Sequence, residues 1–121
     1  MEKTVISKYI RISPKKLRMI IDAVKNKNAE GVLGMIKLTP RKGTKFIFDA
    51  VKSCLTQFDK AIQKDVLIKN VVANKASVFK RWRPGGKGMA HKYVHRTSHL
   101  SVTLSIADKQ NGESDSKFNM K

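Results

Sequence analysis

The sequence predicts an α+β fold, in which three helices pack on a small antiparallel sheet and a long β-hairpin protrudes from it. Apolar residues recur at helical spacing in the N-terminal half, but after Val66 the apolar period changes to two. Between the apolar segments at 66–73 and 100–106, the chain becomes basic and carries Gly and Pro near its middle. An apolar content of 40% over 121 residues suits one domain with one core.

The first strand and the first helix are expected within residues 3–24. Residues 3–12 are rich in β-branched and aromatic side chains, which favours a strand. Ser13 and Pro14 then resemble a helix start, because Ser can cap free backbone N–H groups and Pro suits the first helical position. One apolar stripe follows at i, i+3, i+4 and i+7, formed by Leu17, Ile20, Ile21 and Val24.

Two further helices are expected before residue 59. Asn28 is a candidate cap for a short second helix, although Gly31 and Gly34 weaken its helical propensity. Thr39 and Pro40 repeat the start signal for a third helix. Its stripe predicts a core-facing side and consists of Ile47, Ala50, Val51, Cys54, Leu55 and Phe58.

The C-terminal half predicts one long hairpin. Residues 100–106 alternate apolar and polar side chains, as a half-buried strand does, and residues 66–73 are the expected partner strand. Residues of about 74–99 would protrude, with turn chemistry at Arg83-Pro84-Gly85-Gly86 and Gly88 close behind. An isolated two-stranded ribbon is marginal in water, so a partner must support it.

The expected domain organisation is a single domain over 1–107 and a polar, patternless tail over 108–121. Cys54 is the only cysteine and lies in an apolar stripe, so we expect a buried thiol and a reducing compartment. No apolar run is long enough to span a membrane, and no secretory signal pattern is present.

Charge is the main indication of function. The net charge is +17, and the segment from Val66 to Ala107 contains no Asp or Glu. Like charges repel, so a segment of one sign predicts a partner of the other sign, most commonly a phosphate backbone. Within it, Lys80, Arg81 and Arg83 surround the only tryptophan, Trp82, near a turn where burial is not expected. Arginine binds phosphate and an exposed indole stacks on bases, so this motif favours nucleic acid.

Other chemistry is disfavoured. His91, His95 and His99 are spaced by four, but no carboxylate or cysteine stands nearby to complete a metal site. The sequence has no phosphate-binding glycine loop, no HExxH motif and no nucleophile–base constellation. We therefore predict no enzyme activity, no metal and no cofactor.

Three segments resemble the bacterial-type ribosomal protein L-twenty-two family of the large subunit, over nearly the full length of the chain. They read VISKYIRISPKKLRMIIDAVKNK, IKLTPRKG and FKRWRPGGKGMAHKYVHRTSHLSVTLS. The last is the most specific, because a Lys-Arg-x-x-Pro approach, a Lys-Gly-x-Ala tip and an Arg-Thr-Ser-His strand opening follow in order.

The resemblance implies a structural constituent of the large ribosomal subunit, in bacterial cytoplasm or in an organelle, whose hairpin inserts between rRNA segments and helps line the nascent-peptide exit tunnel. The implied partners are large-subunit rRNA, neighbouring ribosomal proteins and the nascent polypeptide, with no membrane and no homo-oligomer. The resemblance and the basic motif at 80–83 together predict a set of RNA-binding residues. They are Arg11, Ser13, Lys15, Lys16, Arg18, Lys75, Lys80, Arg81, Trp82, Arg83, Lys87, Lys92, Arg96, Thr97, Ser98 and His99. The predicted tunnel-lining tip comprises Lys80, Arg81, Trp82, Arg83, Pro84, Gly85, Gly86, Lys87, Gly88, Met89 and Ala90.

The tip departs from the family pattern of arginine-alanine-lysine-glycine-arginine, because Gly85 and Met89 replace two cations. Two other functions stay open at the level of sequence. An architectural DNA-binding protein with a basic β-arm would enter the minor groove and normally dimerise. A histidine-dependent nuclease or metalloenzyme would need His95 or His99.

Overall fold

The computed structural model describes residues 2–106 of the chain, and the predicted tail at 108–121 lies outside these residues. The predicted α+β class is confirmed. The elements in chain order are β1 (Glu2–Ile10), α1 (Pro14–Val24), α2 (Ala29–Leu38), α3 (Lys42–Leu55), β2 (Val66–Pro84) and β3 (Ala90–Ile106), with short 3-10 turns at Gln63–Asp65 and Gly86–Gly88.

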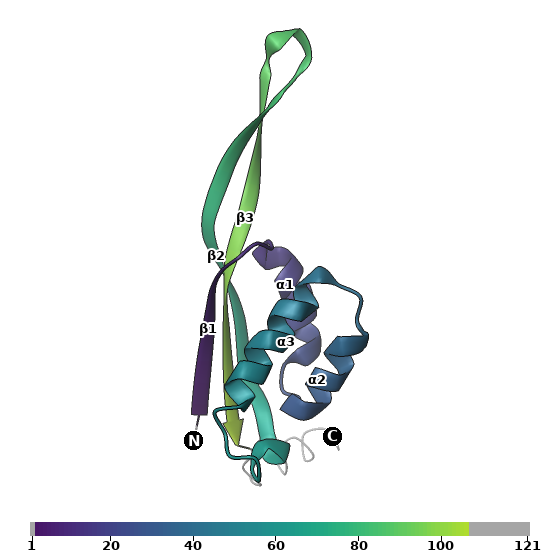
Figure 1. The fold of residues 1–121 in the computed structure, drawn as a ribbon, viewed down its shortest axis with the longest axis vertical. Coiled ribbons are helices and arrows are strands. Elements are labelled where there is room, and N and C mark those ends of the chain that lie inside the picture. Colours follow the sequence, from purple (N-terminus) through teal and green to yellow (C-terminus); the bar gives the residue numbers. More distant parts are fainter. Residues whose placement is uncertain (1, 107–121) are drawn as a thin grey trace, which may run out of the picture.

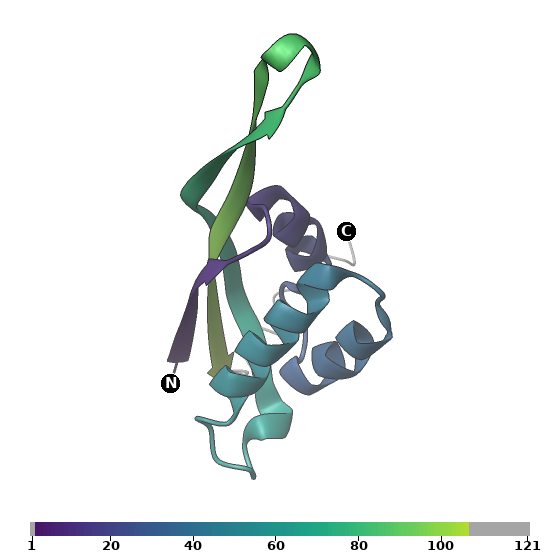
Figure 2. The same ribbon diagram turned by 45° about the horizontal axis from the view of Figure 1, so that its top comes forward.

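The three strands form an antiparallel sheet in the order β1-β3-β2. The central strand β3 pairs with β1 from Glu2↔Ser105 to Ile10↔Ser98, and with β2 from Val66↔Ile106 to Pro84↔Ala90. The three helices cover one face of this sheet. No element of residues 2–106 covers the other face, which we call the open face (Figure 1). The same arrangement is visible after a rotation, in which the β2–β3 hairpin stands clear of the helices (Figure 2).

The core lies between the helices and the sheet. The predicted apolar stripes of the first and third helices are buried throughout. Leu17, Ile47 and Val51 have 0% of their surface exposed. The sheet contributes Leu100, Val102 and Leu104 from β3, together with Val66, Ile68, Val71 and Ala73 from β2. No residue between 74 and 96 belongs to this core, so the globular part and the outer hairpin are separate in their packing.

The helix starts differ in part from the sequence prediction. The Asn28 side chain accepts hydrogen bonds from the backbone N–H groups of Glu30 and Gly31, which confirms the predicted cap. Ser13 precedes α1, but its side chain makes no capping hydrogen bond. The predicted start of α3 at Thr39-Pro40 is wrong, because Thr39 closes α2 through a hydrogen bond from its N–H to the Ile36 carbonyl. The helix begins at Lys42 instead.

The outer hairpin is a continuous two-stranded ribbon. Beyond Ser98, where the pairing with β1 ends, β2 and β3 pair only with each other. We call residues 78–96, from the Val78↔Arg96 pair to the turn and back, the arm. The strands reach Pro84 and Ala90, so the turn occupies Gly85–Met89, slightly later than the predicted turn residues.

Candidate nucleic-acid interface

The strand register gives the arm two chemically different faces. Side chains alternate along each strand, and residues paired across a ladder lie on the same face. One face, which we call the arginine face, carries three cross-strand pairs: Phe79↔His95, Arg81↔Tyr93 and Arg83↔His91. The other face, which we call the lysine face, carries Val78↔Arg96, Lys80↔Val94, Trp82↔Lys92 and Pro84↔Ala90.

The arginine face is a ladder of stacked cations and rings. The Arg83 guanidinium lies 4.6 Å from the centre of the Tyr93 ring, and Arg81 lies 5.8 Å from the Phe79 ring. Tyr93 also contacts His95 edge to face, with 5.3 Å between ring centres. A guanidinium that stacks on a ring keeps the N–H groups at its edge available for phosphate. Arg81 donates one of its own to the Lys80 carbonyl at 3.1 Å, and its other N–H groups have no hydrogen-bond partner within residues 2–106.

The lysine face exposes its large apolar side chains. Trp82 is 63% exposed and Val94 is 38% exposed, on a ribbon with no core beneath it. The indole lies across from Lys92, so its ring is flanked by a cation and open to solvent. An exposed indole between cations offers a stacking surface for a nucleobase.

The tip is a tight turn that depends on glycine. Lys87 and Gly88 both have positive φ angles, of 58° and 71°, and Gly85 donates a hydrogen bond from its N–H to the Met89 carbonyl at 2.5 Å. Met89 points its thioether side chain into solvent, at 67% exposure. The tip therefore presents Lys87 and Met89 at the farthest point from the core.

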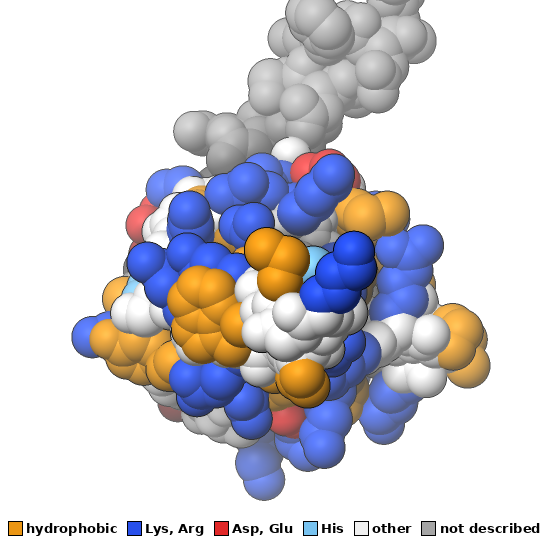
Figure 3. Space-filling model, turned by 90° about the horizontal axis from the view of Figure 1, so that it is seen from above, with side chains coloured by type: hydrophobic (Ala, Val, Ile, Leu, Met, Phe, Trp, Pro, Cys, Tyr) orange, Lys and Arg blue, Asp and Glu red, His pale blue; other side chains and the backbone are white. Residues whose placement is uncertain are grey.

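The electrostatics of the arm are one-sided. Within residues 2–106 the structure contains one ion pair, between Lys69 and Glu2, and it lies on the sheet. The hydrogen bond from Lys69, followed by its positive charge, lowers the pKa of the Glu2 carboxyl below the usual value. No carboxylate lies on the arm, so its cations are uncompensated by the described part of the chain. Seen from the tip, lysine and arginine side chains dominate the surface (Figure 3).

A basic groove lies where the arm leaves the globular part. Its volume is about 630 Å³, and its apolar lining consists of Ile12, Met19, Ile20 and Val94, with Gly43 beside them. Its cations come from four places in the chain that the fold brings together: the β1–α1 loop, α1, the start of α3 and β3. They are Arg11, Lys16, Arg41, Lys42 and Arg96.

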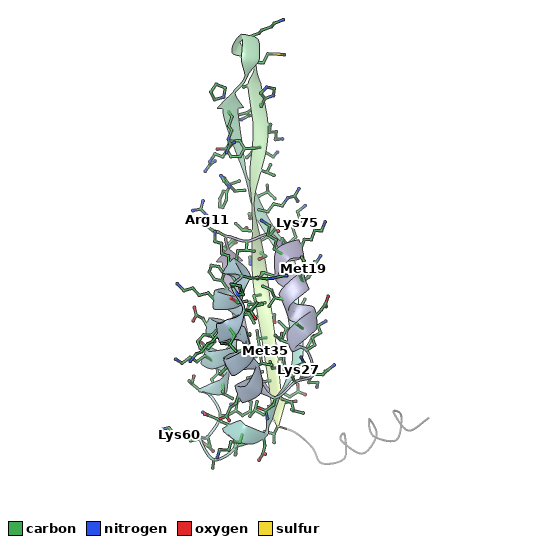
Figure 4. The ribbon with its side chains drawn as sticks, turned by 90° about the vertical axis from the view of Figure 1, so that its right-hand side faces the viewer. Arg11, Met19, Lys27, Met35, Lys60 and Lys75 are labelled. Carbon is green, nitrogen blue, oxygen red and sulfur yellow. The ribbon has the colours of Figure 1, made fainter. Side chains whose placement is uncertain are left out.

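Figure 4 shows how the base of the arm is arranged. Arg11 and Lys75 lie on either side of the ribbon at the level where the arm begins, and Met19 lies just below them on α1. Lys27, Met35 and Lys60 lie toward the opposite end of the molecule. The basic groove and the arm thus form one continuous cationic region, which we propose as the nucleic-acid interface.

Several predicted RNA-binding residues have structural contacts at the base of the arm. Arg18 donates a hydrogen bond to the Ala73 carbonyl at 3.1 Å. Thr97 and Ser98 are buried, and their hydroxyl groups donate to the carbonyl oxygens of Ser77 and Ile12. These two hydroxyl groups join β3 to β2 and to the β1–α1 loop, and an RNA contact by Thr97 or Ser98 stays a prediction.

The remaining predicted residues are accessible. Arg11, Lys15, Lys16, Lys75, Lys80, Arg81, Trp82, Arg83, Lys87, Lys92 and Arg96 are exposed, whereas Ser13 and His99 are partly buried. Arg41 and Lys42 were not predicted, although both line the groove. Only the packing of α3 against α1 places them there, because Gly43 lets the helix start lie directly on Ile20 and Leu17.

The histidine, cysteine and carboxylate side chains in the described part of the chain are the candidate metal ligands. Between Glu2 and Ile106, no three His, Cys, Asp or Glu side chains gather in a way that could hold a metal ion. The Cys54 thiol is buried and donates to the Lys3 carbonyl, and burial raises its pKa above the usual value. None of the helices in residues 2–106 is long and apolar enough to cross a membrane.

Comparison with known proteins assigns a family to this arrangement. The family model described as ribosomal protein L22p/L17e matches residues 5–105. The chain is 34% identical over 107 residues to the large ribosomal subunit protein uL22 of Finegoldia magna, covering 86% of this chain and 96% of that protein. It is 35% identical to the uL22 proteins of Lawsonia intracellularis and Clostridioides difficile, with 87% and 86% of this chain and 96% of each relative covered. These comparisons give no support to the DNA-binding alternative.

Proposed function

The chain belongs to the ribosomal protein L22p/L17e family, and from this premise we propose that it is a structural constituent of the large ribosomal subunit. It binds large-subunit rRNA through the arm and the basic groove, and contacts neighbouring ribosomal proteins. The tip of the arm helps line the nascent-peptide exit tunnel. The protein has no catalysis of its own and supports assembly of the subunit and translation.

One observation carries this proposal: the arm has no carboxylate and no core. A two-stranded ribbon is marginally stable in water unless something packs against it. Here residues 78–96 pair only with each other, and no third strand within residues 2–106 joins them. The uncompensated cations of the arm would repel one another in isolation. Folded RNA supplies both a surface for packing and the negative charge, so it accounts for both features together.

The two faces of the arm give the proposed contacts a mechanism. Arg81 and Arg83 would bind phosphates in a two-pronged manner while their planes stack on Phe79 and Tyr93. Lys80 and Lys92 would act as mobile point charges beside the indole. The basic groove would hold a further stretch of RNA backbone where the arm meets the globular part. The arm would then be fixed at its base and along its length.

The tip is the part that we propose for the tunnel wall. The residues proposed there are Lys80 to Ala90, of which Lys87 and Met89 extend farthest from the core. Support comes from the exposure of Met89 and from the turn geometry of Lys87 and Gly88, which directs the chain back without a bulky element. A narrow tip fits a confined wall between rRNA segments.

A photo-crosslinking amino acid at position 89 tests the proposed place of the tip. In ribosomes that carry a stalled, radiolabelled nascent chain, we expect crosslinks from position 89 to that chain and to large-subunit rRNA. The matched control carries the same amino acid at position 35, on the opposite end of the molecule, where no nascent-chain crosslink is expected. Nascent-chain crosslinks from position 35 but not from 89 would contradict the proposal.

A further inference from the structure

Tyr9 has an unusual conformation at the end of β1. Its φ angle is 58°, in the left-handed region that aromatic residues seldom adopt. Its side chain is nevertheless 59% exposed, so the strain does not serve to bury the ring. The register of β1 against β3 shifts between Ser7 and Ile10, which allows this conformation. Strained residues that the surrounding structure holds in place often lie at ligand-binding points.

His99 holds Tyr9 in this conformation through two contacts. The backbone N–H of Tyr9 donates a hydrogen bond to His99 Nδ1 at 3.2 Å. The two rings meet edge to face, with 4.8 Å between their centres and 80° between their planes. Because Nδ1 accepts a hydrogen bond, the ring proton lies on Nε2, which gives the pair one fixed donor. The orientation of the tyrosine ring is therefore set before any ligand arrives.

The Tyr9–His99 pair lies on the open face of the sheet, and neither residue lines the basic groove. His99 alternates with the buried residues Ser98 and Leu100, so its side chain is directed away from the helices. Lys8 and Arg11 are exposed cations on either side of Tyr9 in the chain. The carboxylate on β1, Glu2, is already paired with Lys69. Aromatic exposure and positive charge thus occur together without a free acid on this strand.

We propose that Tyr9 and His99 form a stacking site for one unpaired RNA base on the open face of the sheet, a site that rests on the rRNA-binding function proposed above. The base stacks on the exposed tyrosine ring, and Lys8 binds the adjacent phosphate. Bases splayed out of single-stranded loops are commonly bound by an aromatic side chain on a sheet. Because none of Lys8, Tyr9 and His99 lines the basic groove, the base bound here lies outside that groove.

Binding of full-length large-subunit rRNA, transcribed in vitro, tests the stacking site. Tyr9→Leu keeps an apolar side chain but removes the ring, and we expect it to weaken binding roughly tenfold, as the loss of one stacked base does. Tyr9→Phe should bind as the unmodified protein does. The salt dependence of Tyr9→Leu should be unchanged, because stacking neutralises no phosphate. Circular dichroism should show all variants folded.

The matched control is Ile6→Ala, which removes a side chain of similar exposure, 58%, from the same strand. It should leave the affinity unchanged. Unchanged binding by Tyr9→Leu would overturn the proposal. So would an equal loss in Tyr9→Phe, because the hydroxyl group rather than the ring would then be the contact.

Ultraviolet crosslinking of isolated large subunits separates this proposal from the proposed function. Trypsin would release Tyr9 in the short peptide Tyr9-Ile10-Arg11, and we expect this peptide to carry a nucleotide. Nucleotide adducts on the arm but none at Tyr9 would overturn the stacking site and leave the ribosomal function standing. A crosslink from Tyr9 to another protein would also overturn it. If the protein does not co-purify with large subunits, both proposals fail together.

Discussion

Gly85 is the residue at which the structure leaves least room for a side chain. A Cβ atom there would lie 2.1 Å from His91 Cδ2 and 2.9 Å from the Met89 carbonyl oxygen. By contrast, a Cβ on Gly86 would meet nothing within 4 Å. The tip conformation therefore requires glycine at position 85 but not at position 86.

Gly85→Ala should displace His91 and the turn, which changes the amide chemical shifts of Gly85–Met89 and weakens rRNA binding. The melting temperature should stay within a few degrees, because the tip contributes nothing to the core. Gly86→Ala is the control and should change neither. The double variant Gly85→Ala/His91→Ala lacks the imidazole that the new Cβ meets, so it should recover part of the lost rRNA binding. If Gly85→Ala left the amide chemical shifts of Gly85–Met89 unchanged, position 85 would not require glycine.

Cys54 gives a prediction about reactivity and pH. Burial raises the pKa of its thiol, so the folded state favours the neutral form more than the unfolded state does. The buried neutral thiol therefore favours the folded state fully at a pH below the usual thiol pKa. Stability falls as the pH rises above that value, because the thiol ionises more readily in the unfolded chain. We expect dithionitrobenzoate to react slowly with the native protein at pH 8 and rapidly in denaturant. Fast reaction in the native state would contradict the buried position.

At the scale of elements, the arm should be dispensable for folding. Replacement of residues 82–92 by Asn-Gly leaves the Arg81↔Tyr93 pair beside a two-residue turn, which preserves the strand register. The shortened protein should keep its circular dichroism spectrum in the helical region and its cooperative unfolding. A matched core variant, Ile47→Ala, should lower the free energy of unfolding by about 2–5 kcal/mol. Unfolding of the shortened protein would show that the arm belongs to the core.

Sequence patterns predicted the elements that have a strong period. The stripes of α1 and α3 and the alternation in β3 each have one buried side, so their patterns are unambiguous. The boundary between α2 and α3 was missed because Thr39 can cap either helix, and only the tertiary fold assigns it to the end of α2.

The candidate site was predictable only where it is contiguous in sequence. Lys80 to Arg83 stand out from the acid-free segment, whereas Arg41 and Lys42 come into the groove through the packing of α3 on α1. The polar sequence around Thr97 and Ser98 suggests that both are accessible. In the structure both are buried where β1 and the β1–α1 loop pack against β3. Tyr9 read as an ordinary strand residue, because backbone strain has no signature in its side-chain pattern.

At the scale of the whole molecule, charge is distributed unevenly along the long axis. The carboxylates of the described residues all lie in the globular part, while the arm carries cations only. Phosphate contacts release counterions, so the slope of log affinity against log salt concentration reports how many cations take part.

This distribution predicts a change in salt dependence. Lys80→Ala/Arg81→Ala/Arg83→Ala should reduce the slope for rRNA binding by about 2–3, at roughly 0.7–0.9 per lost phosphate contact. The control removes Lys27 and Lys60, which lie at the opposite end of the molecule, and should change the slope much less. Equal slopes for the triple variant and the unmodified protein would exclude the arm as a phosphate-binding surface.

Sedimentation in the native cells tests whether this protein is a constituent of the large ribosomal subunit. A tagged copy is followed through a sucrose gradient with magnesium present and then chelated, after washing in high salt. We expect it to sediment with the large subunit under both conditions, while a copy with residues 82–92 replaced by Asn-Gly is lost more readily in the salt wash. Recovery at the top of the gradient, or with DNA, would show that the protein is not a constituent of the large subunit.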